Sequence, residues 1–256
     1  MRTVYVIGIG AGDRDHLTLE AVAAMNRTDV FFTIDKGDAK GDLAALRAEL
    51  LARHVTRAHR VVTARDPQRD RTAATPGYAA AVGDWQERRA ALYERMLADE
   101  LGDDGIGAFL VWGDPALYDG TLRILDGIRE RGRVVFDVVS IPGISAVQAL
   151  AAAHRVVLNR VGRPFLVTTG RRLADEGPPP GVDDVVVMLD AVDAFARVPT
   201  DTARWDIYWG AYLGTPDQVL VHGDLREVRA RIVGLRAELR ARKGWIMDTY
   251  LLRRIR

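Results

Sequence analysis

The first residues whose spacing could support chemistry form a glycine-rich loop near the N-terminus. Gly8, Gly10 and Gly12 alternate with other residues directly after the apolar run 4–7, and Asp13 follows them. In the dinucleotide-binding pattern G-x-G-x-x-G the third glycine would fall at Asp13, whose carboxylate would repel a pyrophosphate. The spacing therefore disfavours a dinucleotide site. It leaves two alternatives, a tight turn or a loop that lines a cleft for another ligand.

Asp13 and Asp15 stand between this loop and the segment 17–25, whose apolar residues have helical spacing. Carboxylates accept hydrogen bonds from the free N–H groups at a helix start and interact favourably with the helix dipole. We therefore expect these two residues to cap that helix.

Three further turns carry small or polar residues at the ends of predicted strands or helices. They are Gly113-Asp114-Pro115, Pro142-Gly143 and Gly214-Thr215-Pro216. Bare backbone and a carboxylate suit a ligand with ammonium and hydroxyl groups. Asp114 and Ser145 each have an alternative role, because Asp and Ser are also common caps of the helices that follow such turns.

The elements that hold these turns alternate between strand and helix over the first half of the chain. We expect strands at 4–9, 29–34, 55–62, 105–112, 134–138, 165–169, 184–189, 206–213, 218–223 and 245–252, and helices at 17–25, 42–54, 78–101, 122–131, 145–154, 191–198 and 225–241. Alternation predicts an α/β protein with a parallel sheet, and the crowded strands of the last third predict some antiparallel pairing. We expect two α/β domains, 1–117 and 118–256.

The composition excludes several classes of protein. The 256 residues contain no cysteine, which removes disulfides, zinc ribbons, iron–sulfur clusters and thiol nucleophiles. The five histidines form no metal-binding pattern, so no metal is expected. A net charge of +1 gives no general attraction to nucleic acid or to a membrane surface. Without a signal peptide or an apolar run of about 18 residues, the chain is expected to be cytoplasmic.

Four motifs in a fixed order carry a family resemblance. They are Gly8-Ile9-Gly10-Ala11-Gly12-Asp13 with His16-Leu17-Thr18, then Val111–Tyr118, Ile141–Ala146 and Gly214–Gly223. Together they resemble the tetrapyrrole methylases, the S-adenosylmethionine-dependent enzymes of corrin and sirohaem synthesis. The resemblance covers nearly the whole chain. It implies two α/β domains with the active-site cleft between them, a folded cofactor in that cleft, a modified tetrapyrrole (precorrin) substrate and a homodimer.

Further segments indicate which branch of the family the chain resembles. They are 31–37, Asp42-Leu43, Arg47, Tyr78, Val82, Trp85, Tyr118-Asp119, 208–210 and 245–248. These segments are similar to the branch that methylates a precorrin ring at C1 and releases acetate in aerobic cobalamin biosynthesis. The alternative is a member that acts at a different ring position.

The resemblance also implies which residues hold S-adenosylmethionine. They are Gly113, Asp114, Leu117, Ser145, Ala146, Met188, Tyr212, Leu213, Gly214 and Gly244. Met188 has the alternative role of an ordinary core residue. Tyr212, Leu213 and Gly214 would offer backbone donors and acceptors to the adenine.

Release of acetate implies a water molecule that attacks an acetyl carbonyl, a base, and a donor to the oxyanion. The candidates are Asp13, Tyr118 and Asp119, with His16 and Asp35 as further polar residues at strand ends. Some family members carry an arginine shortly after the GDP motif, but this chain has Tyr118-Asp119-Gly120-Thr121 there, so the role of that arginine cannot be transferred.

The carboxylates of a precorrin would be held by basic side chains. Lysines are rare in this chain, and the candidates are Arg2, Arg14, Lys36, Lys40, Arg47, Arg88, Arg89 and Arg123.

Overall fold

The computed structural model describes residues 1–35, 41–67 and 75–255, except for the side chains of residue 42 and residues 75–82. Several residues named above therefore lie outside the described part of the chain, either entirely (Lys36 and Lys40) or in their side chains (Asp42, Tyr78 and Val82).

The chain divides into two compact units. The first contains Met1–Gly10 and Arg14–Ile144, and the second contains Ala11–Asp13 and Ser145–Arg256. The division thus falls between Ile144 and Ser145 rather than between residues 117 and 118. The reason is that the strand Phe136–Ile141 pairs in parallel with the first strand, which places it and the helix before it in the first unit.

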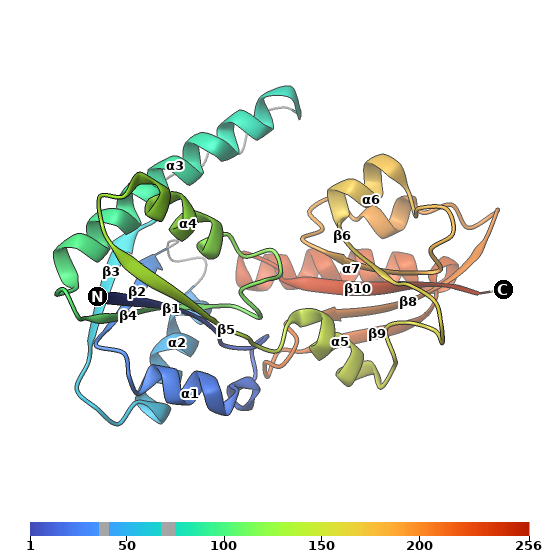
Figure 1. Cartoon of the computed structure of the whole chain (residues 1–256). Helices are drawn as coiled ribbons and strands as arrows, with labels where there is room; N and C mark the ends of the chain where they lie inside the picture. The colour runs from blue at the N-terminus through green and yellow to red at the C-terminus, as the bar shows by residue number, and fades with distance from the viewer. Residues whose placement is uncertain (36–40, 68–74, 256) are drawn as a thin grey trace. The chain divides into compact units, whose positions relative to one another are not determined.

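The first unit is a parallel sheet with helices on both faces (Figure 1). Its strands are β1 (Arg2–Gly8), β2 (Val30–Asp35), β3 (Arg60–Arg65), β4 (Ile106–Val111) and β5 (Phe136–Ile141), in the order β3-β2-β4-β1-β5. Its helices are α1 (Leu19–Met25), α2 (Gly41–His54), α3 (Thr75–Glu100) and α4 (Thr121–Arg131), with a short 3-10 turn, η1 (Arg14–His16). The predicted α/β class and parallel pairing are confirmed here.

Alternating side chains of β1 explain the two layers of helices. Val4 and Val6 pack with residues of α3 and α4 on one face, whereas Tyr5 and Ile7 pack with residues of α1 and α2 on the other. Because both faces of this strand are buried, its sequence is a nearly continuous apolar run, as residues 4–9 show.

The second unit is a mixed sheet, as the crowded strand signals predicted. Its strands are β6 (Leu166–Thr169), β7 (Asp184–Met188), β8 (Arg204–Ala211), β9 (Val219–Asp224) and β10 (Asp248–Ile255), in the order β6-β7-β10-β8-β9. Only β6 and β7 are parallel, and the other three pairings are antiparallel. Its helices are α5 (Ala146–His154), α6 (Gly170–Glu176) and α7 (Leu225–Lys243), with the 3-10 turn η3 (Ala194–Arg197). The sequence analysis missed α6.

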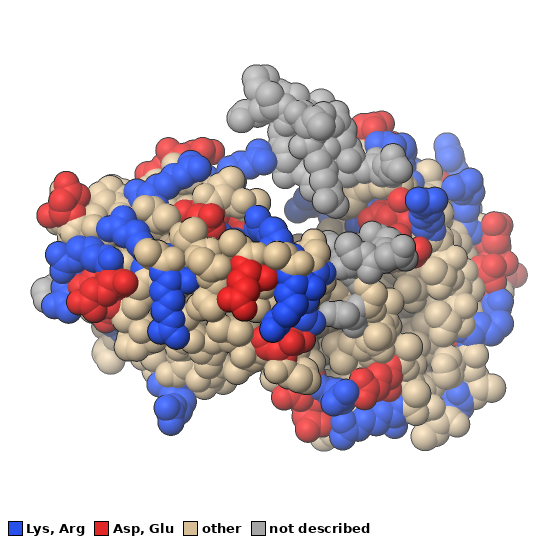
Figure 2. Space-filling model, turned by 180° about the vertical axis from the view of Figure 1, so that it is seen from behind, with Lys and Arg blue, Asp and Glu red and all other residues tan. Residues whose placement is uncertain are grey.

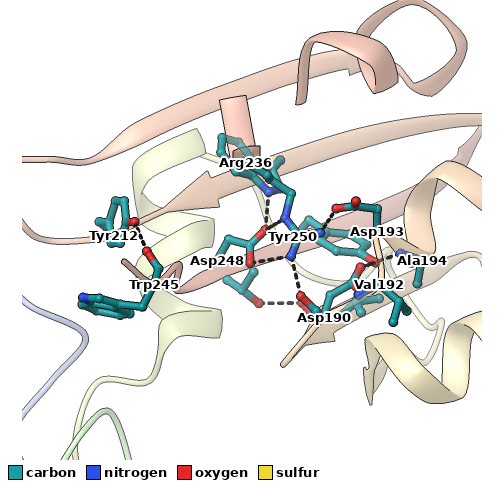
Figure 3. A network of polar contacts seen from close by, with 12 residues as sticks. Asp190, Val192, Asp193, Ala194, Tyr212, Arg236, Trp245, Asp248 and Tyr250 are labelled. Carbon is teal, nitrogen blue, oxygen red and sulfur yellow. Dashed lines mark hydrogen bonds and ion pairs between the residues drawn. The ribbon is translucent and has the colours of Figure 1, made fainter. Parts of the chain in front are cut away.

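A buried arginine joins three parts of the second unit (Figure 3). The side chain of Arg236 on α7 is 3% exposed and forms an ion pair with Asp248 of β10, with 2.9 Å between Nε and Oδ2. Its guanidinium also contacts the Asp193 carboxylate and the backbone oxygen of Asp190. Tyr250 donates to Oδ2 of Asp190 at 2.8 Å. The network thus fixes α7, β10 and the segment that leads into η3.

Asp248 is the most strongly shifted carboxylate of this network. Burial raises its pKa to about 6, although Arg236 and the indole N–H of Trp209, 2.7 Å from Oδ2, favour the ionised form. The carboxylate therefore gives up its proton less readily in the folded state than in the unfolded chain.

Replacing Arg236 with leucine should destabilise the protein by about 3–5 kcal/mol, because it leaves the buried carboxylate of Asp248 without its counter-ion. Urea unfolding measures the change. Arg231→Leu, at an exposed position of the same helix, is the matched control and should stay within about 0.5 kcal/mol of the wild type. Equal effects of the two substitutions would contradict a special role of Arg236.

Asp248 should also give stability a defined pH dependence. A carboxylate whose folded pKa lies above its unfolded value contributes stability that is present below the unfolded pKa and is lost as pH rises through the folded one. Relative to Asp248→Asn, the wild type should therefore lose about 1–3 kcal/mol between pH 4 and about 6.5, at roughly 1.4 kcal/mol per unit of pKa shift. If the free energies of unfolding of the two proteins change with pH in parallel over this range, the predicted role of Asp248 is refuted. Asp175→Asn, at an exposed position on α6, is the control.

Candidate functional site

Three backbone segments meet closely at the carboxyl edge of the first sheet. A Cβ atom on Gly8, at the end of β1, would lie 2.6 Å from the nitrogen of Gly143 and 2.7 Å from the oxygen of Gly113. A Cβ on Gly143 would overlap the same Gly113 oxygen. No side chain fits at these positions, so the glycines are explained by close approach of the backbones that follow β1, β4 and β5.

Asp114 holds this meeting point together. Its Oδ2 accepts the N–H of Gly143 at 2.9 Å, and its Oδ1 accepts the N–H of Ala116 at 2.8 Å. The carboxylate therefore joins the turn after β4 to the turn after β5. It does not cap α4, because the N-cap of that helix is Gly120, which has no side-chain hydrogen bond. Just before the helix, Oδ1 of Asp119 accepts the N–H of Thr121 at 2.8 Å.

The glycine loop after β1 packs against the same turn. Gly10 and Gly113 form an isolated antiparallel bridge, in which the N–H of Gly113 donates to the oxygen of Gly10 at 2.8 Å. The expected capping by Asp13 and Asp15 is wrong, because Thr18 is the N-cap of α1 and accepts the N–H of Ala21 at 3.0 Å. Asp13 is half-buried at the start of η1.

His16 ends η1 beside Gly10. Its Nδ1 is buried and has no hydrogen-bond partner among the described residues. A buried polar atom without a partner is costly, so this nitrogen is available for a water molecule or a ligand group.

The second half of the loop after β4 has a strained conformation. Tyr118 has a φ of 55° although it is not glycine, and its side chain is 45% exposed. Leu117 is half-buried beside it. Left-handed non-glycine residues cost free energy and cluster at functional sites.

In the second unit, Ser145 is the N-cap of α5. Its hydroxyl accepts the N–H of Val147 at 3.1 Å and donates to the side chain of Gln148, and the helix begins at Ala146. The capping alternative for Ser145 is therefore confirmed. Ser145 is buried, whereas Met188 at the end of β7 is half-buried.

Leu189 was missed by the sequence analysis. It follows Met188, has a φ of 53°, and is 63% exposed. Like Tyr118, Leu189 is a non-glycine residue with an exposed side chain and a left-handed backbone conformation in a loop that follows a strand. The one available sequence signal was its position as the last apolar residue of a predicted strand.

Tyr212 links the turn that was predicted to contact adenine to the loop that starts at Gly244. Its hydroxyl donates to the backbone oxygen of Trp245 at 2.6 Å (Figure 3), and its N–H donates to the oxygen of Met247 at 2.9 Å. This brings the loop that starts at Gly244 against the turn after β8. The N–H of Tyr212 is thus already used within the protein.

The other residues of these loops serve as turns or as a helix end. Gly214 donates its N–H to the side chain of Gln218 at 2.9 Å. Gly244 is the left-handed C-cap of α7. Leu213 is buried, and no described residue bonds to its backbone N–H in this turn.

The predicted basic residues divide into two groups. Arg2 lies at the start of β1, opposite the carboxyl edge, and pairs with Asp103 at 3.1 Å. Arg14 and Arg88 form surface ion pairs with Glu49 and Asp84. Arg47 and Arg89 line a pocket at the carboxyl edge of the first sheet, together with Asp119.

Two absences can be stated for the described part of the chain. No group of three or more histidine, aspartate or glutamate side chains within it could hold a metal ion. None of the helices there is long and apolar enough to cross a membrane.

Comparisons with known proteins agree with this arrangement of strand-end loops. The family described as Tetrapyrrole (Corrin/Porphyrin) Methylases matches residues 3–229. A precorrin-6A synthase [deacetylating] of Sinorhizobium sp is 48% identical over 255 residues, which cover 99% of this chain and 96% of that protein. The structure of a cobalamin synthesis related protein (CobF) of Corynebacterium diphtheriae is 39% identical with a TM-score of 0.83, over the whole of both chains.

A more distant structure shows the fold alone. The uroporphyrin-III-C-methyltransferase of Thermus thermophilus is 19% identical with a TM-score of 0.59, over 98% of this chain and 91% of that one. The agreement of the family match, the full-length relative and the shared fold leads to one conclusion: this chain belongs to the tetrapyrrole methylase family.

Proposed function

We propose that this enzyme transfers the methyl group of S-adenosylmethionine to C1 of precorrin-5 and releases acetate, which gives precorrin-6A. The observation that carries the proposal is the 48% identity to a precorrin-6A synthase [deacetylating] across nearly the full length of both proteins. The proposal includes S-adenosylmethionine as methyl donor, with no metal, and a precorrin as the partner.

The residues present fit such a cofactor. The turn 113–117 supplies backbone groups and an apolar side chain, Leu117, while Met188 and Leu213 supply apolar surface and backbone in the second unit. The Nδ1 of His16, which has no hydrogen-bond partner among the described residues, is a further polar group at the same sheet edge. When bound, S-adenosylmethionine supplies a methyl group that a ring carbon can attack.

The protein's contribution to methyl transfer is then mainly positioning, since an oriented pair of reactants can recover roughly 7–11 kcal/mol of the barrier. The bonds from Asp114 to Gly143 and Ala116 keep the backbone of the turn in one place. The left-handed Tyr118 and Leu189 are held by their surroundings in conformations that a free chain would avoid.

Release of acetate is the second step. Water adds to the acetyl carbonyl carbon and gives its protons to a base, and the bond between that carbon and the macrocycle breaks so that acetate leaves. The electron pair of the broken bond stays on the macrocycle, where it neutralises the positive charge left by methyl transfer. Asp13, Tyr118 and Asp119 are the proposed groups that position the water or the proton. The proposal for Asp119 is compatible with its hydrogen bond to Thr121, because Thr121 uses only Oδ1.

The proposal extends to assembly and location. We place the enzyme in the cytoplasm as a homodimer without nucleic-acid or membrane partners. Acidic and basic side chains are interspersed on the face shown in Figure 2, which fits the net charge of +1. The edge strand β5 exposes Val135 just before it and Val139 within it, which supplies apolar surface for a second copy. Sedimentation of the purified protein tests the homodimer.

The decisive experiment is incubation of the protein with S-adenosylmethionine and precorrin-5. Mass spectrometry should show one added methyl group and one lost acetyl group, with one equivalent of acetate. Methylation without acetate release, or at another ring carbon, would instead indicate a family member with a different position of action.

Asp114→Ala should lower both the melting temperature and the affinity for S-adenosylhomocysteine, because both carboxylate oxygens hold backbone N–H groups of the loop. Two lost charge-assisted bonds correspond to about 2–5 kcal/mol. Calorimetry and thermal unfolding measure the two effects. Asp126→Ala, on the exposed face of α4, should change neither. Lost affinity with an unchanged melting temperature would show that Asp114 acts on the ligand itself.

Methyl transfer and acetate release should be separable by substitution. Tyr118→Phe removes a hydroxyl, and Asp119→Asn removes a charge but keeps the oxygen that accepts the N–H of Thr121. The affinity of both variants for S-adenosylhomocysteine should therefore stay within about threefold of the wild type. At least one of Asp13→Asn, Tyr118→Phe and Asp119→Asn should slow acetate release by about 100-fold. Rapid-quench sampling of both products measures this. Acetate that follows methylation one-to-one in all three variants would exclude a dedicated residue among them.

A further inference from the structure

A small pocket lies at the carboxyl edge of the first sheet, beside the loop that carries Tyr118 and Asp119. It encloses about 50 Å³ between the ends of β2 and β4. Its polar lining comes from Thr33, Arg47, Arg89, Tyr93, Asp119 and Thr121. A space of this size accommodates one carboxyl-sized group and little more.

Arg47 is held in this pocket by backbone oxygens. Its Nε donates to the oxygen of Leu110 at 2.9 Å, and its Nη1 donates to the oxygen of Leu43 at 3.1 Å. These bonds fix the guanidinium plane. Among the described residues, no carboxylate lies within 4 Å of it, and no partner bonds to Nη2. A largely enclosed cation without a counter-ion is unusual, because no ion pair offsets the free energy that its desolvation costs.

The electrostatics of Arg47 agree with this geometry. Burial lowers its pKa, while the negative charge of Asp119 acts in the opposite direction without forming an ion pair. An entering anion would favour the charged form of Arg47 and replace the lost hydration.

Arg89, the second cation of the pocket, is already neutralised. Its Nε donates to Oδ1 of Asp66 at 2.8 Å, and its guanidinium lies 4.5 Å from the centre of the Trp85 ring. Burial raises the pKa of Tyr93 to about 12, so its hydroxyl keeps its proton at neutral pH. Among the residues that the structure describes, Arg47 is therefore the one cation of this pocket without an ion pair.

We infer that this pocket binds a single carboxylate group, with the free edge of the Arg47 guanidinium as its anchor. The inference rests on the proposed function, which offers two sources of that group. One is the acetate that is set free, and the other is an acetate or propionate side chain of the precorrin.

Arg47→Gln and Arg47→Lys test the inference, and Arg53→Gln, an exposed position on the same helix, is the matched control. Arg47→Lys keeps the charge but loses the planar fork. The first measurement is direct binding: sodium acetate, compared with sodium chloride at equal ionic strength, should raise the melting temperature of the wild type and of Arg53→Gln, but not that of Arg47→Gln.

The second measurement separates the two sources. If a substrate side chain occupies the pocket, both Arg47 variants should raise the KM for precorrin-5 by about 10- to 100-fold, with acetate release still following methylation. If the released acetate occupies it, KM should change little, and a methylated product that keeps its acetyl group should accumulate. The wild-type reaction is the reference, since its failure would refute the proposed function rather than this inference.

The inference is overturned if acetate stabilises the wild type and Arg47→Gln equally while KM and both rates stay unchanged. It is also overturned if both Arg47 variants lose only melting temperature, because Arg47 would then serve only to hold the oxygens of Leu110 and Leu43.

Discussion

The closeness of three backbone segments at one sheet edge is the constraint on which the first unit depends. Gly8, Gly113 and Gly143 follow three neighbouring parallel strands, and no side chain fits between them. Asp114 joins two of these segments through its carboxylate. Parallel strands bring their carboxyl ends to one edge, and ligands of open α/β sheets bind there. The contacts that close this edge of the fold thus also shape the backbone of the candidate site.

The second unit is held by a different interaction. The carboxyl ends of antiparallel strands do not meet at one edge of the sheet. In this unit Arg236 instead connects α7 to the carboxylates of Asp248 and Asp193. Burial raises the pKa of Asp248, so part of the attraction between its carboxylate and Arg236 offsets the free energy that burying the charge costs. The loop with Tyr212 and Trp245 lies beside it, so the turns assigned to the cofactor rest on a rigid core.

The sequence predicted the fold well where the signal was local. The apolar run 4–9, the helix 145–154 and the antiparallel strands of the last third are all present, since periodicity and composition determine them. The sequence-based prediction failed where the structure depends on pairing between strands that are far apart in the chain. The boundary at residue 117 was wrong in position because β5 completes the sheet of the first unit, a contact across more than a hundred residues.

The prediction of the site has the same limit. The motifs indicated turns that lie after strands, but not that the oxygens of Asp114 are used within the protein, nor that Thr18 rather than Asp13 caps α1. Arg47 was one of eight basic candidates, and only the backbone oxygens around it distinguish it from arginines with surface ion pairs.

The order of strands in the first sheet has a consequence for how the chain is made. β1 lies between β4 and β5, which are both synthesised long after it, so Thr3 pairs with Ile106 and Arg2 with Phe136. At about 5–20 residues per second, roughly 5–20 s pass between synthesis of β1 and that of its first partner. Throughout this interval an apolar segment with two unsatisfied edges remains exposed on the nascent chain. Until β4 has been made, β1 therefore carries a risk of aggregation on the nascent chain, which a chaperone that covers it would lower.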